Sequence, residues 1–228
     1  MDKVLVVTGP TATGKTKLAL KLAQKFNGEV ISADSRQVYK YLDIVTGKDK
    51  HLLDKDTKIW GYDLVEPNEE FSAKLYADFA TQTIEDIVSR GKLPIIEGGT
   101  GFYIDAALKK MEHIAVPKNT KLREKYQNLS ADKLFGIFLK VSPTKAILLN
   151  ESDRKNPRRL LRILEKLDFE MRGYALDKSD MKEKYDTLWI GLNYKTREQL
   201  YSQIDKRVDS RLGEALEKEI IFLKQNNF

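Results

Sequence analysis

The sequence contains no cysteine among its 228 residues. This absence excludes disulfide bonds, thiolate metal sites and cysteine nucleophiles. No apolar run approaches the ~20 residues that a membrane-spanning helix requires, and residues 1–8 do not have the layout of a signal peptide. Internal repeats and low-complexity stretches are absent as well. These absences favour a cytoplasmic protein that does not enter a membrane.

The composition is that of a folded globular protein, with 41% hydrophobic and 32% charged residues. A chain of this length forms one domain, or one domain with an insertion. Its charge is uneven: residues 1–114 hold 16 Lys and Arg against 17 Asp and Glu, whereas residues 115–228 hold 24 against 17. The basic second half is consistent with a polyanionic partner or with an ordinary lysine-rich surface.

Strand and helix patterns alternate in the first half of the chain. Short apolar runs predict buried strands at 4–7, 29–32 and 93–96. Apolar faces at helical spacing predict helices at 15–26, 72–89 and 102–109. Glycine turns after the strands indicate a parallel sheet covered by helices. Residues 35–68 are rich in turn signals, and we expect mainly loops there.

The second half begins with a different pattern. Helical periodicity and basic residues dominate residues 116–184. Residues 187–192 predict a strand that returns to the sheet, and residues 196–224 predict one long amphipathic helix. We therefore expect an α/β core made of residues 1–115 and 185–228, interrupted by a helical insertion.

The strongest motif lies between the first predicted strand and the first predicted helix. It fits the pattern G-x-x-x-x-G-K-[ST] of a phosphate-binding loop, and it comprises Gly9, Pro10, Thr11, Ala12, Thr13, Gly14, Lys15 and Thr16. In such a loop, Lys15 would neutralise phosphate oxygens and Thr16 would ligate Mg²⁺. The fold class is then a P-loop NTPase-like parallel sheet flanked by helices, with a helical insertion. The bound compound stays open between a nucleotide and another pyrophosphate ester.

Polar residues follow the second and third predicted strands. Asp34 follows the second strand, and Thr100 follows the third within Gly98-Gly99-Thr100-Gly101. Because the carboxyl ends of parallel strands share an edge, both should face the phosphate-binding loop. Asp34 can accept a proton or support Mg²⁺, and Thr100 can contact a transferred group; the alternative for each is a helix N-cap. Glu97 stands where a Walker-B acid is expected, but the usual Asp is missing, which disfavours an ordinary NTP hydrolase.

Five basic residues occupy the nine positions from Arg154 to Arg162. A helix should begin here, with Asn156 as its N-cap and Pro157 as its first residue. Its apolar face would comprise Leu160, Leu164 and Leu167. The basic side chains would then suit contacts with nucleic-acid phosphates, or they form a solvated helix face.

Together these segments resemble the tRNA dimethylallyltransferases. The matching stretches are GPTATGKT at 9–16, ISADSRQVYKYLDIVTGK at 31–48, KHLLD at 50–54, GKLPIIEGGTGFYIDAAL at 91–108, NPRRLLRILE at 156–165 and TREQLYSQIDKRVDSRL at 196–212. They occur in the order found in that family and span nearly the whole chain. The combination of SADSRQVYK with GGTGFY is not a feature of small-molecule kinases.

The resemblance implies transfer of a dimethylallyl group from dimethylallyl diphosphate to the exocyclic N6 of the adenosine 3′ of the tRNA anticodon. Residues 11–16 would bind the donor's diphosphate, with Lys15 offsetting the charge of the leaving group and Thr16 near Mg²⁺. Asp34 would be the general base that takes the N6 proton, and Thr100 would lie in the channel where donor and base meet. The acceptor base must leave its stack, and anticodon-loop bases do so readily.

The resemblance also implies contacts with the tRNA anticodon loop. These would come from Asp34, Ser35, Arg36 and Gln37, and from Asn156, Pro157, Arg158, Arg159 and Leu160. The insertion at 116–184 would grip the tRNA. Its run 135–141, which fits a helix or a strand equally well on its pattern alone, would be helical. We expect a monomer.

Some features depart from the family pattern. Val45 stands where Gly is usual, and Ser142 stands where Asp is common. The chain ends at Phe228, whereas bacterial members usually continue through a segment rich in Gly, Tyr and Arg, one arginine of which helps to bind the diphosphate. We therefore expect either a fragment or a naturally short form with reduced or lost activity.

Three alternatives remain open from the sequence. A P-loop kinase of a small metabolite would consume ATP without transferring a dimethylallyl group. An adenylate isopentenyltransferase would use a free nucleotide as acceptor, so its activity would respond less to salt than that of an enzyme acting on tRNA. A truncated protein could bind tRNA without turnover.

Overall fold

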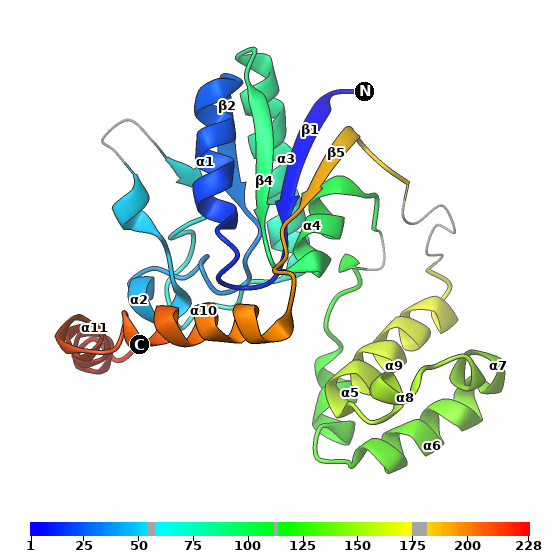
Figure 1. Cartoon of the computed structure of the whole chain (residues 1–228). Helices are drawn as coiled ribbons and strands as arrows, with labels where there is room; N and C mark the ends of the chain where they lie inside the picture. The colour runs from blue at the N-terminus through cyan, green and yellow to red at the C-terminus, as the bar shows by residue number, and fades with distance from the viewer. Residues whose placement is uncertain (54–57, 112–113, 175–181) are drawn as a thin grey trace. The chain divides into compact units, whose positions relative to one another are not determined.

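Parallel strands form a five-stranded sheet in the computed structural model, which describes residues 1–53, 58–111, 114–174 and 182–228. The strands are β1 (Lys3–Thr8), β2 (Gly28–Ser32), β3 (Ile59–Trp60), β4 (Leu93–Gly98) and β5 (Asp186–Gly191), in the order β3-β2-β4-β1-β5. Every neighbouring pair is parallel; in β1 and β4, for example, Leu5 lies opposite Ile95. The carboxyl ends of the strands therefore share one edge of the sheet (Figure 1), and the predicted parallel sheet is confirmed.

Helices cover both faces of this sheet: α1 (Lys15–Lys25) lies on one face, and α3 (Ala73–Ser89) and α4 (Gly101–Leu108) lie on the other. Two further helices, α10 (Arg197–Asp209) and α11 (Glu214–Gln225), lie beyond the carboxyl edge of the sheet (Figure 1). Two short helical segments, α2 (Asp43–Thr46) and η1 (Lys50–Leu52), complete the sheet unit. On β1, Leu5 and Val7 pack against α1, whereas Val4 and Val6 pack against α3 and α4. Successive strand side chains point to opposite faces, so a strand covered on both sides must be apolar throughout.

Residues 111–181 form a second compact unit. It is distinct from the sheet unit, which comprises residues 1–110 and 182–228. Its helices are α5 (Thr120–Tyr126), α6 (Ala131–Val141), α7 (Pro143–Ile147), α8 (Glu151–Arg154) and α9 (Pro157–Met171). We call it the helical unit. Its boundaries lie within a few residues of the predicted 116 and 184, and a contact between this unit and tRNA stays a prediction.

The helical unit has a hydrophobic core of its own. Leu134 and Phe138 of α6 pack with Leu160 and Leu164 of α9, and all four are at most 4% exposed. The run 135–141, ambiguous on its pattern, is therefore helical. The predicted start of α9 is also confirmed, because the Asn156 side chain accepts a hydrogen bond from a backbone N–H of the first turn.

Residues 35–68 are mainly loops, as predicted, but they also contain the edge strand β3, whose two residues are too few to give a sequence pattern. The prediction of a single helix at 196–224 is wrong, because this range forms two helices, α10 and α11. They separate before Gly213, which has a φ of 139° that only glycine adopts readily, although the amphipathic pattern continues across it.

None of the helices in the described ranges is both long enough and apolar enough to cross a membrane.

Candidate active site

The phosphate-binding loop connects β1 to α1 at the carboxyl edge of the sheet. Ala12 and Gly14 have positive φ values of 65° and 81°, and the loop curls so that Lys15 Nζ donates to the Pro10 carbonyl at 2.9 Å. The first turn of α1, which the structure describes in full, carries no acidic side chain. Its free N–H groups and the Lys15 ammonium together make a site suited to an anion.

The residues after β5 hold this loop in place. The Tyr194 hydroxyl donates to the Ala12 carbonyl at 3.0 Å. Gly9 passes so close to Leu192 that a Cβ on Gly9 would lie 2.2 Å from the Leu192 carbonyl oxygen. The loop conformation therefore depends on glycine at this position and on a residue far along the chain.

Thr16 and Glu97 form a buried polar pair beside the loop. Thr16 Oγ1 lies 3.5 Å from Glu97 Oε1, and the two residues are 8% and 2% exposed. Burial raises the pKa of Glu97 to about 7, although the positive charge of Lys15 lowers it. Oxygen ligands of this kind suit Mg²⁺. No group of three or more acidic or histidine side chains that could hold a metal ion is found within the described ranges.

Several charged side chains at this edge act on one another. The pKa of Lys15 is lowered, first by burial; the negative charge of Glu97 opposes this effect, and the positive charge of Arg207 adds to it. Asp34 and Asp49 also raise the pKa of Lys15. The predicted loop lysine and the predicted base therefore belong to one electrostatic neighbourhood.

Asp34 and Thr100 lie on adjacent loops, as the parallel sheet predicts. Thr100 Oγ1 accepts from the Ser35 N–H at 3.4 Å, and the Thr100 N–H donates to the Ala33 carbonyl at 3.3 Å. This approach requires Gly98, since a Cβ there would lie 2.4 Å from the Ala33 carbonyl oxygen. The end of β4 can touch the loop after β2 because glycine stands at 98.

The N-cap alternative is wrong for Asp34. Asp34 Oδ1 accepts from the Arg36 N–H at 2.8 Å, but residues 35–38 form a turn and no helix begins there. Thr100 does occupy the N-cap position of α4, but its side chain makes no capping hydrogen bond, and its hydroxyl instead accepts from the Ser35 N–H. Both side chains are therefore available at the strand ends.

The segment from Asp34 to Gln37 divides into exposed and buried residues. Arg36 is exposed, but Gln37 is only 7% exposed. Ser32 Oγ donates to Gln37 Oε1 at 2.8 Å, and Gln37 Nε2 donates to the Gly47 carbonyl at 3.1 Å. The predicted tRNA contact through the Gln37 side chain is thus contradicted in the folded unit, because that side chain ties two loops together.

Helix α10 brings residues to the site that the sequence interpretation did not assign. It runs past the carboxyl ends of the strands (Figure 1). A cavity of about 370 Å³ lies between it and the phosphate-binding loop, and is lined by Ala12, Gly14, Lys15, Thr16, Asp49, His51, Gln203, Lys206, Arg207, Ser210 and Arg211. Arg207 lies on α10, and Arg211 follows four residues later in the turn after this helix. The two basic residues at this spacing, downstream of a strand that ends at this edge, were the sequence signal for these cavity residues.

Asp49 connects the two arginines. Its Oδ1 accepts from Arg211 Nη2 at 3.0 Å and lies 3.4 Å from Arg207 Nη2. Arg207 Nη2 also donates to the Gly47 carbonyl at 3.2 Å. Part of the basic excess of the second half therefore lies on the sheet unit, at the phosphate-binding loop, and not only on the helical unit.

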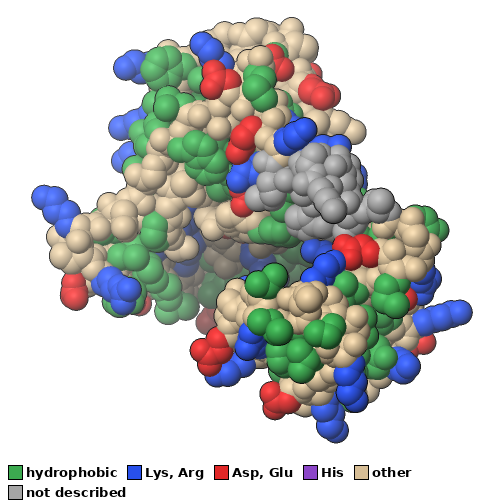
Figure 2. Space-filling view, turned by 90° about the vertical axis from the view of Figure 1, so that its right-hand side faces the viewer, with side chains coloured by type: hydrophobic (Ala, Val, Ile, Leu, Met, Phe, Trp, Pro, Cys, Tyr) green, Lys and Arg blue, Asp and Glu red, His purple; other side chains and the backbone are tan. Residues whose placement is uncertain are grey.

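Within the described part of the helical unit, some basic residues form ion pairs, and others do not. Arg159 pairs with Asp153 at 2.5 Å, and Arg162 pairs with Glu165 at 3.0 Å. Arg158 is exposed, and no acidic partner for it is found among the described residues. On the face seen in Figure 2, Lys and Arg side chains of this unit lie at separate places with acidic side chains between them. Of the two predicted arginine contacts on α9, Arg158 is therefore less committed to the fold than Arg159.

Leu160 was predicted to contact tRNA, but it does not lie at the surface. It is fully buried in the core of the helical unit. A contact between its side chain and RNA is therefore contradicted in the folded unit, and its function there is packing.

Comparison with known proteins places the chain among prenyl-transferring enzymes. A sequence profile described as IPP transferase matches residues 37–227. A protein of Caldanaerobacter subterraneus subsp. tengcongensis named tRNA dimethylallyltransferase is 39% identical over 97% of this chain and 72% of its own length. A protein of the same name from Lactobacillus acidophilus is 37% identical over 99% of this chain and 74% of its own.

Solved structures give the same result. A tRNA delta(2)-isopentenylpyrophosphate transferase from Staphylococcus epidermidis is 33% identical, with a TM-score of 0.63 over all of this chain and 75% of that one. A eukaryotic dimethylallyltransferase acting on tRNA is 31% identical, with a TM-score of 0.79 over all of this chain and 58% of that one. The similarity thus covers both the sheet unit and the helical unit.

Proposed function

The chain belongs to the IPP transferase family, and on this premise we propose that it transfers a dimethylallyl group from dimethylallyl diphosphate to N6 of the adenosine 3′ of the tRNA anticodon. The main support for this proposal is that the phosphate-binding loop and the candidate general base lie at the same edge of the sheet. The phosphate-binding loop follows β1, and Asp34 and Thr100 follow β2 and β4. The named relatives favour this activity over the kinase and adenylate isopentenyltransferase alternatives.

The diphosphate of the donor is proposed to bind in the cavity beside the phosphate-binding loop. The N-terminus of α1 supplies N–H donors and a partial positive charge. Lys15 and Arg207 line the same cavity, and both bring positive charge to phosphate oxygens. When the bond from the allylic carbon to the diphosphate oxygen breaks, the negative charge that develops on the leaving group is stabilised by these donors.

Asp34 is proposed as the general base. The N6 nitrogen attacks the allylic carbon, a carbon–nitrogen bond forms, and diphosphate leaves with the electron pair of the carbon–oxygen bond. The nitrogen then carries an extra proton, which the Asp34 carboxylate takes. Thr100, tied to the Ser35 N–H, is proposed to line the channel beside this carboxylate. The N–H bond and the carboxylate must lie within hydrogen-bond reach in the complex.

A Mg²⁺ ion fits this arrangement. The Thr16 hydroxyl and the Glu97 carboxylate lie on the loop side of the site, both buried, and they are proposed to hold the ion together with substrate oxygens. When bound, Mg²⁺ supplies charge stabilisation to the diphosphate. The pKa of Glu97, which burial raises, would fall when a cation binds beside it.

The tRNA is proposed to be held by exposed basic side chains. Arg36 lies next to Asp34, and Arg158 lies on α9 of the helical unit. Phosphate contacts of this kind give affinity that falls as salt rises. The acceptor base would be extruded from the loop into the site, where Asp34 acts on it.

The direct test is an assay of the 228-residue chain with isotopically labelled dimethylallyl diphosphate and unmodified tRNA. We expect label in the tRNA, located at N6 of the adenosine 3′ of the anticodon by mass spectrometry of the nucleosides. Asp34→Asn should abolish most of the transfer. Label transfer to free adenine nucleotide but not to tRNA, or ATP consumption without transfer, would contradict the proposal.

A further inference from the structure

Arg211 lines the cavity of the phosphate-binding loop but has no role in the proposed reaction. It stands in the last turn before α11, at 27% side-chain exposure, and its guanidinium reaches Asp49 across the cavity. Burial lowers the pKa of Arg211, and the positive charge of Arg207 lowers it further. An arginine half-buried beside another arginine is costly unless an anion compensates both.

Asp49 compensates only one of these charges. The same carboxylate oxygen, Oδ1, serves Arg207 and Arg211, so two guanidinium groups share a single negative charge. Lys15 and Lys206 add further positive charges to the cavity wall. Asp49 is the one carboxylate among the described residues that line the cavity. The cavity therefore retains an excess of positive charge that suits an anion with more than one charge.

The backbone at Gly47 makes room for the Arg211 side chain. A Cβ on Gly47 would lie 2.0 Å from Arg211 Nη1 and 2.8 Å from its Cζ, and Gly47 has a φ of 71°. Any residue other than glycine would occupy the space that the guanidinium fills. The path of Arg211 into the cavity thus depends on one residue 164 positions earlier in the chain.

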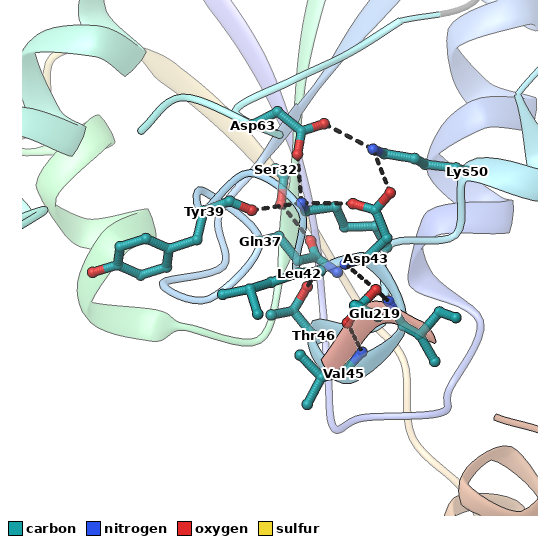
Figure 3. Close-up of polar contacts among 12 residues, drawn as sticks. Ser32, Gln37, Tyr39, Leu42, Asp43, Val45, Thr46, Lys50, Asp63 and Glu219 are labelled. Carbon is teal, nitrogen blue, oxygen red and sulfur yellow. Dashed lines mark hydrogen bonds and ion pairs between the residues drawn. The ribbon is translucent and has the colours of Figure 1, made fainter. Parts of the chain in front are cut away.

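The loop that carries Gly47 and Asp49 is held rigidly. The side chain of Lys48 is 0% exposed, and its Nζ donates to Asp43 at 2.9 Å, to Asp63 at 2.5 Å and to the Tyr39 carbonyl at 2.6 Å. Glu219 of α11 accepts from three backbone N–H groups at the start of α2. Figure 3 shows these contacts converging on one loop. Asp49 is therefore a fixed anchor, and the arginines it holds are preorganised.

We propose that Arg211 is a binding residue for the donor's diphosphate, held by Asp49 in the gap that Gly47 leaves. The inference rests on the proposed function and deepens it. The phosphate-binding loop and Lys15 take one phosphate group, and Arg211 with Arg207 takes the other from the side of α10. Bidentate guanidinium contacts to phosphate are among the stronger charge-assisted hydrogen bonds.

The test is isothermal titration of the full chain with inorganic pyrophosphate in excess Mg²⁺. Arg211→Met should weaken pyrophosphate binding by about 10- to 100-fold, the effect of losing hydrogen bonds to a charged group. The matched control is Arg172→Met, which removes an arginine from another Arg–Asp pair, with Asp168 at 2.8 Å in the helical unit. The control should change pyrophosphate affinity by less than about twofold.

The Asp49→Asn variant distinguishes a role of Arg211 in binding diphosphate from a purely structural role in holding the loop. If Arg211 binds diphosphate, this variant keeps both cations and removes a competing negative charge, so it should lose less affinity than Arg211→Met. Equal losses in the two variants would show that Arg211 only ties α10 to the loop, and would overturn the inference.

The Gly47→Ala variant tests the role of Arg211 independently. It should displace the guanidinium and weaken pyrophosphate binding in the wild-type background, but should have no further effect in the Arg211→Met background. Equal effects in both backgrounds would contradict the inference. Wild-type chain that binds no pyrophosphate would overturn the proposed function itself, whereas normal wild-type binding together with normal Arg211→Met binding would overturn only the role of Arg211.

Discussion

In the sheet unit, several charged side chains near the strand ends are buried or half-buried and share partners; in the helical unit, several basic side chains form simple ion pairs at the surface. The Lys48 side chain is 0% exposed between two aspartates, and Asp49 serves two arginines. By contrast, the pair Lys155–Glu151 is 75% and 80% exposed. Buried charges fix distances, which catalysis needs, whereas exposed charges supply attraction that adapts to the shape of a polyanion.

The helical unit contains one exception that sharpens this contrast. Glu165 has a side chain that is 0% exposed, and it accepts from Arg123 Nε at 2.6 Å, Arg162 Nη1 at 3.0 Å and the Asn119 N–H at 3.0 Å. These contacts tie α9 to α5. A buried charge in this unit therefore fixes the fold of the unit and leaves Arg158 on the surface for other contacts.

The largest effect is expected at Asp34. Asp34→Asn keeps the size of the side chain but removes the proton acceptor, so the rate of dimethylallyl transfer should fall by about 10²- to 10⁴-fold. Pyrophosphate affinity should stay within about twofold, because Asp34 is not a diphosphate ligand in this account. Transfer kinetics and titration calorimetry check the two parts. The control, Asp78→Asn, changes an exposed aspartate that pairs with Lys74 on α3 and should leave the rate unchanged.

The next effect is a loss of stability at Lys48. Lys48→Met should lower the free energy of unfolding by about 3 kcal/mol, because it leaves two carboxylates without their buried partner. Lys50 is a matched control, since it contacts the same Asp43 and Asp63 at 2.7 and 2.9 Å but is 42% exposed. Lys50→Met should cost at most about 1 kcal/mol. Equal losses of unfolding free energy in the two variants would contradict the proposed difference between buried and exposed charges.

Tryptophan fluorescence during urea unfolding measures this difference in one unit alone. The chain has two tryptophans, Trp60 and Trp189, and both lie on strands of the sheet unit, β3 and β5. The helical unit can be followed in parallel by far-UV circular dichroism. Lys48→Met should shift the fluorescence transition to lower urea.

Much of the site could be predicted from the sequence because it depends on local rules. The G-x-x-x-x-G-K-[ST] pattern fixes the loop between β1 and α1. Parallel strand ends must share an edge, so Asp34 and Thr100 could be expected together, and Asn156-Pro157 fixes the start of α9. Each of these follows from a short pattern or from sheet topology.

The remainder depends on contacts between distant residues. Asp49 and Arg211 are separated by 162 residues, and no pattern relates them. Gln37 looks like a polar surface residue in the sequence, but its side chain is buried by contacts with Ser32 and Gly47. The edge strand β3 exists because β2 offers it a partner, not because its two residues have a strong preference.

A smaller effect is expected at Glu165. Glu165→Gln should destabilise the helical unit by about 1–3 kcal/mol at pH 7, since it removes the charge that two arginines share. The control is Glu170→Gln on the same helix, where the side chain pairs with Lys145 and is 35% exposed. Its cost should be below about 1 kcal/mol.

The Glu165 effect should depend on pH with a defined sign. Burial raises the pKa of Glu165, but the hydrogen bonds from Arg123 and Arg162 outweigh burial and hold the pKa below its ordinary value of 4.5. Its stabilising contribution is therefore complete above pH 4.5 and is lost as the pH falls through the lower folded-state value. Unfolding of wild type and Glu165→Gln, followed by circular dichroism, should converge below pH 4.5. A difference that grows on acidification would contradict this assignment.

The smallest effect is expected at Arg158. Arg158→Ala should weaken tRNA binding by only a few-fold and reduce the salt slope of the association constant by about one, with no change in stability. Arg159→Ala should reduce the slope less, because Arg159 already pairs with Asp153. Filter binding at several salt concentrations measures both. An unchanged slope in Arg158→Ala would remove α9 from the RNA contact.

We propose that the sheet unit performs the chemistry while the helical unit contributes affinity for RNA. The most direct test is the single-turnover rate of dimethylallyl transfer at saturating tRNA and donor, compared between wild type, Asp34→Asn and Arg158→Ala. We predict that saturation restores the Arg158→Ala rate to that of wild type and leaves Asp34→Asn slower by about 10²-fold or more. A normal rate for Asp34→Asn, or a large loss for Arg158→Ala that saturation does not restore, would contradict the account.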